Sequence, residues 1–135
     1  MSGVRQAKNA ETRAKLIAAA RAAFGEKGYA AASMDDFTAA VGLTRGALYH
    51  QFGDTQGLFQ AVVEQIDGEM AVRLKAISDR APDRWQGVVD EWSAYIEMAL
   101  EPEIQQVMFR DGPAVLGDIS QWNSADGCVL TLKES

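Results

Sequence analysis

The sequence contains a single cysteine, a single histidine and only three prolines among 135 residues. Cys128 alone cannot form an intramolecular disulfide, and no second Cys or clustered His accompanies it, so neither a disulfide framework nor a metal site is expected. Residues 1–10 lack the apolar segment of a signal peptide, and no run of about eighteen apolar residues occurs anywhere. These absences predict a cytoplasmic protein that needs no membrane, metal or other cofactor.

Charge is unevenly distributed along a chain of otherwise ordinary globular composition, with 47% hydrophobic and 24% charged residues. The net charge of −6 argues against non-specific coating of nucleic acid. Residues 1–60, however, contain seven Lys or Arg and five Asp or Glu, a net charge of +2, whereas the remainder carries −8. This asymmetry predicts an N-terminal part that faces anions, joined to an acidic body.

Helical periodicity dominates the sequence. Apolar residues at three- and four-residue spacing predict long helices over residues 9–27, 54–80 and 83–100, with a last short helix between Pro102 and Pro113. No alternating pattern is long enough to require a sheet, so the predicted fold class is all-α.

The last segment, residues 118–135, is rich in Ser, Asn, Asp and Gly and has weak periodicity. We expect it to be irregular, with at most a short strand at residues 128–132.

Two short helices between residues 33 and 53 form the informative pattern. Ser33 and Asp36 have the spacing of a capping box with Asp in place of Glu, and Thr44 can cap the second helix through its hydroxyl. Gly42, between the two helices, fits a tight turn that needs a positive φ. These features predict a helix-turn-helix, although a glycine corner by itself is common in all-helical proteins.

The exposed side of the second short helix combines groups that suit DNA. Arg can donate two hydrogen bonds to a guanine edge, whereas hydroxyls and N-terminal helix amides suit phosphate oxygens. Gly46 would allow close approach. The single His50 has no partner at ligand spacing for a metal and no visible nucleophile beside it. The residues expected on this exposed side are Thr44, Arg45, Gly46, Tyr49, His50 and Gln51.

Four runs of residues follow one another in a recognisable order over nearly fifty positions: TRAKLI at 12–17, AAFGEKGY at 22–29, SMDDF at 33–37 and VGLTRGALYHQF at 41–52, followed by Leu58 and Phe59. In these runs the sequence resembles the DNA-binding domain of the tetracycline-repressor (TetR) family. The resemblance implies a helical regulator in which three helices bind an operator and the later helices form an effector pocket and a dimer interface. It also implies that Ser33, Thr44, Tyr49 and His50 contact phosphates or nearby edges, that Arg45 and Gly46 face bases, and that Phe24, Leu48 and Phe52 are core.

The resemblance divides the chain into a DNA-binding domain at residues 9–53, a partial ligand-binding and dimerisation domain at 54–117, and a divergent tail at 118–135. Thr55 stands where family members usually carry a Lys that grips phosphate, which predicts one fewer cationic contact. Because the usual continuation is not visible after Gly117, we expect a weak or concentration-dependent homodimer.

The predicted function is a repressor that leaves a palindromic operator when a small apolar or aromatic effector binds. Trp92 and Tyr95 are the predicted pocket residues, although their helical spacing fits plain core equally well. The alternative is a protein-interaction module that binds DNA poorly and pairs with a full-length relative. An enzyme is not expected, because no pair of titratable residues forms a recognisable catalytic arrangement.

Overall fold

The computed structural model describes residues 2–42 and 44–117, and within these ranges it contains helices and connecting turns but no strand. The prediction of an all-α fold is therefore confirmed. The predicted irregular tail, its possible strand and Cys128 lie outside the described residues. The chain divides into two compact units, Met1–Val62 and Val63–Ser135. Among the helices described, none combines the length and apolarity needed to cross a membrane.

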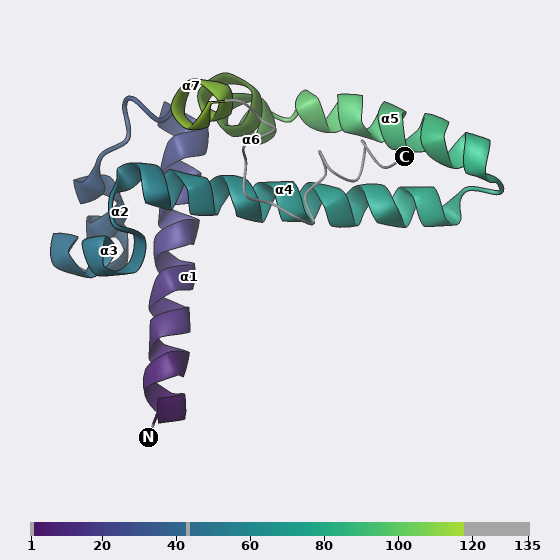
Figure 1. Cartoon of the computed structure of the whole chain (residues 1–135). Helices are drawn as coiled ribbons and strands as arrows, with labels where there is room; N and C mark the ends of the chain where they lie inside the picture. The colour runs from purple at the N-terminus through teal and green to yellow at the C-terminus, as the bar shows by residue number, and fades with distance from the viewer. Residues whose placement is uncertain (1, 43, 118–135) are drawn as a thin grey trace. The chain divides into compact units, whose positions relative to one another are not determined.

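The first unit contains α1 (Ser2–Lys27), α2 (Met34–Val41), α3 (Arg45–Phe52) and the beginning of α4 (Thr55–Arg80). Figure 1 shows α2 and α3 as short helices beside the long α1. The helix α1 begins earlier than the predicted residue 9, because the preceding residues include good helix formers and no proline. The unit extends past residue 53, because Leu58 and Phe59 of α4 are buried in its core.

Aromatic rings join the helices of the first unit. The ring centroid of Phe24 lies 5.1 Å from those of Phe37 and Phe59, and the rings of Tyr29 and Phe59 are 5.0 Å apart. Such tilted and edge-to-face pairs add to the free energy gained from burying apolar area. Leu48 is the buried residue of α3. This core fixes α2 and α3 against α1.

The second unit consists of the later part of α4, α5 (Arg84–Ala99), α6 (Pro102–Ile104), the π-helical segment η1 (Gln105–Asp111) and α7 (Gly112–Leu116), as far as it is described. The helices predicted at 54–80 and 83–100 are confirmed. Asp83 caps α5, since its Oδ1 accepts a hydrogen bond from the Gln86 N–H at 2.8 Å. The apolar core comprises Val63, Ile66, Met70, Leu74, Met98, Ile104, Val107 and Met108.

The prediction that Pro102 and Pro113 bracket one short helix is wrong in its second boundary, because helical structure continues to Leu116. In a regular α-helix the ring of Pro113 would collide with the carbonyl of the residue four positions earlier. Here the preceding turn is π-helical, and the Gly112 N–H donates to the Val107 carbonyl. The wider turn lets Pro113 occupy the start of α7, where no backbone N–H is needed.

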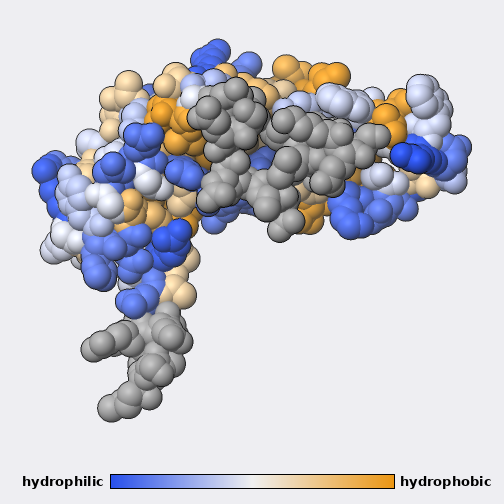
Figure 2. All heavy atoms as spheres, in the orientation of Figure 1, coloured by the Kyte–Doolittle hydropathy of each residue, from blue (hydrophilic) through white to orange (hydrophobic). Residues whose placement is uncertain are grey.

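One face of α5 presents large apolar side chains to the surface. Figure 2 shows orange, hydrophobic spheres along this helix. Trp85 is 75% exposed and Leu100 is 70% exposed, at opposite ends of the helix. We call this surface the α5 apolar face: Trp85, Val89, Trp92, Ile96 and Leu100.

Candidate nucleic-acid interface

The turn between α2 and α3 has the predicted helix-turn-helix geometry. Ser33 Oγ accepts a hydrogen bond from the Asp36 N–H at 3.3 Å, and Asp36 Oδ2 accepts one from the Ser33 N–H at 3.0 Å. This reciprocal pair is the predicted capping box. The C-terminal cap of α2 is Gly42, with φ 68° and ψ 28°. The expected positive φ is therefore confirmed, and the turn has a conformation that favours glycine.

Thr44 caps α3 as expected, because its Oγ1 accepts a hydrogen bond from the Ala47 N–H at 3.2 Å. A hydroxyl that accepts a bond through a lone pair still has its own proton to donate. Both cap residues, Ser33 and Thr44, therefore retain a donor for an anion while they fix the starts of their helices.

Four of the predicted contact residues share one side of α3. At about 100° per residue, positions 45, 46, 49 and 50 fall within an arc of about 140°. Arg45, Gly46, Tyr49 and His50 are all exposed, and Tyr49 is 52% exposed, whereas Leu48 is fully buried. The structure thus brings the predicted residues of this helix together on a polar outer face.

Arg45 makes an ion pair that the sequence analysis did not identify. Its Nε and Nη2 both donate to Oδ1 of Asp35, at 3.0 and 2.8 Å. This contact uses the Nε proton and one Nη2 proton. Both Nη1 protons and the second Nη2 proton, at the outer end of the guanidinium, are left to donate to another group. Asp35 is therefore a further candidate interface residue. The only sequence signal for it was an acidic residue in the first turn of α2.

Two lysines of the first unit are also engaged in ion pairs. Lys15 pairs with Glu11 at 3.1 Å, and Lys27 pairs with Asp36 at 3.3 Å. These pairs are exposed, and exposed pairs contribute little, so they can exchange for other anions at small cost.

Arg13 lies 4.6 Å from the centroid of the Phe52 ring. Phe52, expected to be core, is only half-buried, and this guanidinium lies over its ring. The contact joins the end of α3 to α1 through a cation and a ring face.

The N-terminus of α4 already carries an anionic group. Asp54 Oδ1 accepts a hydrogen bond from the Gly57 N–H at 2.7 Å. Burial, assisted by the negative charge of Asp54, raises the pKa of Tyr29 above its ordinary value. With Thr55 as the first residue of this helix, the carboxylate is not offset by a lysine at that position. The site therefore favours anion binding less than an uncapped helix N-terminus would.

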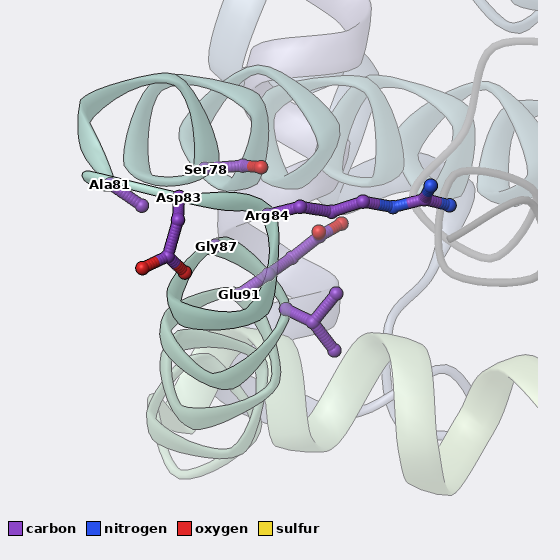
Figure 3. Close-up of a pocket in the computed structure, with 7 residues that line it drawn as sticks. Ser78, Ala81, Asp83, Arg84, Gly87 and Glu91 are labelled. Atoms are coloured by element: carbon purple, nitrogen blue, oxygen red, sulfur yellow. The ribbon is translucent and has the colours of Figure 1, made fainter.

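The second unit contains a cavity of about 260 Å³ near the turn that joins α4 to α5, lined by Ser78, Ala81, Asp83, Arg84, Gly87, Val88 and Glu91. Figure 3 shows the Glu91 carboxylate reaching into this region from α5. Glu91 is 4% exposed, and its Oε1 has no hydrogen-bond partner among the described residues. Sequence reasoning missed Glu91, because a single acid on a helix gives no signal of burial.

The predicted pocket residues, Trp92 and Tyr95, do not line this cavity. Trp92 is 46% exposed, and its ring centroid lies 6.0 Å from that of Tyr95. The Tyr95 ring in turn lies 6.0 Å from that of Phe109 in η1. These three rings form an aromatic row from α5 to η1. Nowhere in the described residues do three or more His, Cys, Asp or Glu gather in a way that could hold a metal ion.

Two family models match the chain. The model of bacterial regulatory proteins of the tetR family matches residues 16–62, which contain the helix-turn-helix. The model of the tetracyclin repressor-like C-terminal domain matches residues 85–135. Similarity to the family therefore extends beyond Gly117, where the visible motifs ended.

Individual relatives are regulators of transcription. The HTH-type transcriptional repressor AcnR of Corynebacterium glutamicum is 29% identical over 105 residues, which are 77% of this chain and 54% of AcnR. The HTH-type transcriptional regulator TtgR of Pseudomonas putida is 39% identical over 56 residues, 42% of this chain and 27% of TtgR. The chain thus spans about half the length of the AcnR relative.

A crystal structure of a TetR-family transcriptional regulator from Pectobacterium atrosepticum is similar to this chain in sequence and in fold. The identity is 61% and the TM-score is 0.77, over 85% of this chain and 60% of the other.

Proposed function

Because this chain belongs to the TetR family of bacterial regulatory proteins, we propose that it is a DNA-binding regulator of transcription that reads an operator through α3. The observation that carries the proposal is the exposed polar face of α3, held in place by the capped turn at Gly42. A helix presented in this way fits the major groove of B-DNA, with its N-terminal residues toward the base edges.

Each predicted contact residue has a role that follows from its chemistry. The hydroxyls of Ser33 and Thr44 donate to phosphate oxygens next to the helix starts. Tyr49 and His50 donate to phosphates or nearby edges from the next turn. Arg45 presents the free end of its guanidinium to a guanine, where O6 and N7 accept both bonds. Gly46 adds no side chain that would hold the helix away from the groove.

The DNA-binding face has few cations, which affects how its affinity depends on salt. The capping carboxylate of Asp54 stands at the start of α4, and Thr55 supplies no ammonium there. Fewer neutralised phosphates release fewer counterions, so the slope of log affinity against log salt is shallow. Contacts to base edges then contribute a larger share of the binding free energy than phosphate contacts do in a more cationic domain.

Two copies of the chain are needed to read a palindromic operator, because half-sites lie about 34 to 36 Å apart and a single domain makes too few contacts. The α5 apolar face is the described surface that favours self-association. A small effector that binds the second unit would release the dimer from DNA, and Trp92 and Tyr95 stay predicted contacts for it. The protein acts as a repressor in the cytoplasm, where the chromosome lies, and carries out no catalysis.

The test starts from an operator selected from random duplexes by the full chain, followed by titration of Arg45→Ala against that operator. The expected loss is about 1 to 3 kcal/mol of binding free energy, with relaxed preference at one base position. Lys75→Ala is the matched control, because Lys75 is also an exposed cation paired with a carboxylate, Asp79, but in the second unit. Equal affinity and preference of Arg45→Ala and wild type would show that Arg45 does not read a base.

A second candidate function is a protein-interaction module that pairs with a longer relative through the α5 apolar face. The exposed fractions of Trp85 and Leu100 favour it. Sedimentation equilibrium separates the two functions. A dimer that binds one operator supports the regulator, whereas a strict monomer that does not bind DNA supports the interaction module.

A further inference from the structure

The cavity between the end of α4 and the start of α5 contains a buried carboxylate oxygen without a partner. Glu91 is 4% exposed, and its Oε1 accepts no hydrogen bond within the described chain. Buried polar groups are almost always hydrogen-bonded, because an unpaired one loses its hydration without compensation. An oxygen left in this state beside a cavity points to a bound group that the described residues do not supply.

Gly87 lies where the end of α4 and the start of α5 approach each other closely. A Cβ at Gly87 would lie 3.3 Å from Ser78 Oγ and 3.7 Å from the Ala81 Cβ, so glycine at this position permits the close approach that forms this wall of the cavity. Gly87 itself is buried, and Glu91 follows it by one helical turn on the same side of α5. From this turn of α5 the Glu91 side chain extends among the residues that line the cavity (Figure 3).

Acceptors predominate among the polar atoms that line the cavity. Asp83 adds a second carboxylate, of which Oδ1 already accepts the Gln86 N–H. Ser78 adds a hydroxyl, and the end of α4 adds the negative end of a helix dipole. Arg84 is the single cation of the lining, and its side chain is exposed. A guest with several N–H donors and a positive charge matches this set.

We infer that this cavity is a binding site for a small organic cation, an ammonium or amidinium compound with a short apolar body, held by Glu91. Ala81 and Val88 supply apolar contact for that body. Only two carboxylates line the cavity, and no cluster of three or more metal ligands occurs in the described part of the chain, so an organic cation fits better than a divalent metal. That the ligand changes DNA binding rests on the proposed function; binding itself does not.

Three compounds of the same shape test the charge requirement: benzamidinium, neutral benzamide and anionic benzoate. Each is titrated into the full chain labelled with ¹⁵N, and the amide signals of α5 are followed by NMR. We expect a saturable shift centred on Gly87 with benzamidinium, and affinities weaker by about tenfold or more for the other two. Equal binding of all three, no saturable shift with benzamidinium, or displacement of it by millimolar Mg²⁺ would overturn the inference.

Variants separate the role of Glu91 from general effects of charge. Glu91→Gln keeps the size of the side chain and should weaken benzamidinium binding by about tenfold or more. Gly87→Ala should weaken it without any change of charge, because the added Cβ would lie 3.3 Å from Ser78 Oγ and push the lining apart. Glu97→Gln removes an exposed carboxylate of the same helix and should leave binding unchanged. Arg84→Gln should leave it equal or tighter, because a like charge is removed. Wild-type affinity in Glu91→Gln would refute the assignment.

Operator binding is measured separately, with and without benzamidinium. Failure of the free protein to bind any selected operator counts against the proposed function and leaves the NMR result standing. Failure of the NMR titration counts against the cation site and leaves operator binding standing.

Discussion

Replacing Gly42 tests the helix-turn-helix at the residue where α2 ends. With φ 68° and ψ 28°, this residue is in the left-handed region, which L-residues with a side chain rarely adopt. A Cβ added there would meet no atom within 4 Å. The effect of Gly42→Ala therefore comes from backbone conformation alone, without a packing contribution.

The magnitude follows from two opposing contributions. The left-handed conformation costs a residue with a Cβ about 1 to 2 kcal/mol. Alanine also restricts the unfolded chain more than glycine does, which returns about 0.4 to 1 kcal/mol. We expect Gly42→Ala to lower the free energy of unfolding by about 1 kcal/mol, and Gly42→Val by more, since β-branched residues tolerate this region least.

Asparagine provides the matched control, because it adopts the left-handed conformation more readily than other L-residues. Gly42→Asn should lie between wild type and Gly42→Ala. At Gly53, φ is 82° but ψ is −56°, outside the left-handed region that asparagine tolerates. Gly53→Asn should therefore be as destabilising as Gly53→Ala. Asparagine should thus be less destabilising than alanine at Gly42 but not at Gly53.

Urea unfolding followed by circular dichroism at 222 nm measures these differences, with a constant m-value as the check that only stability has changed. Titration of Gly42→Val against the operator adds a functional readout. Relative to wild type, the operator affinity of this variant should fall by a larger fraction than its helical content. If Gly42→Ala and Gly42→Asn both unfold at the wild-type urea concentration, the left-handed turn is refuted.

Three further predictions concern capping and charge. Ser33→Ala should lower the free energy of unfolding by about 1 kcal/mol through loss of the α2 cap, again measured in urea. The hydrogen bond from the Ser33 N–H, with help from Lys27, lowers the pKa of Asp36. The ionised Asp36 carboxylate therefore stabilises the folded state fully above its unfolded-state pKa, and this stabilisation is lost as pH falls through its folded-state pKa. Asp36→Asn should weaken the dependence of the melting temperature on acid pH. Arg73 donates to both oxygens of Glu101, at 2.7 and 3.3 Å, but both side chains are about half exposed. Arg73→Ala should therefore cost at most about 1 kcal/mol, and less at high salt.

Features governed by neighbours along the chain could be predicted from the sequence. The capping box of Ser33 and Asp36, the left-handed Gly42 and the cap at Thr44 each depend on residues no more than four positions apart, and all were predicted correctly. The same holds for the long helices and for the outward face of α3, since helical periodicity alone determines which side chains share a side. The family resemblance came from this part of the chain, where local rules constrain residue types most strongly.

Contacts between residues far apart in sequence were decided by the tertiary structure. The Arg45–Asp35 pair crosses a turn, so its partners meet only once α2 and α3 pack against each other. The burial of Glu91 depends on how the end of α4 approaches α5, which the sequence of α5 does not encode by itself. Local sequence determines dihedral angles and helix faces, whereas the environment of a side chain depends on which helix packs against it.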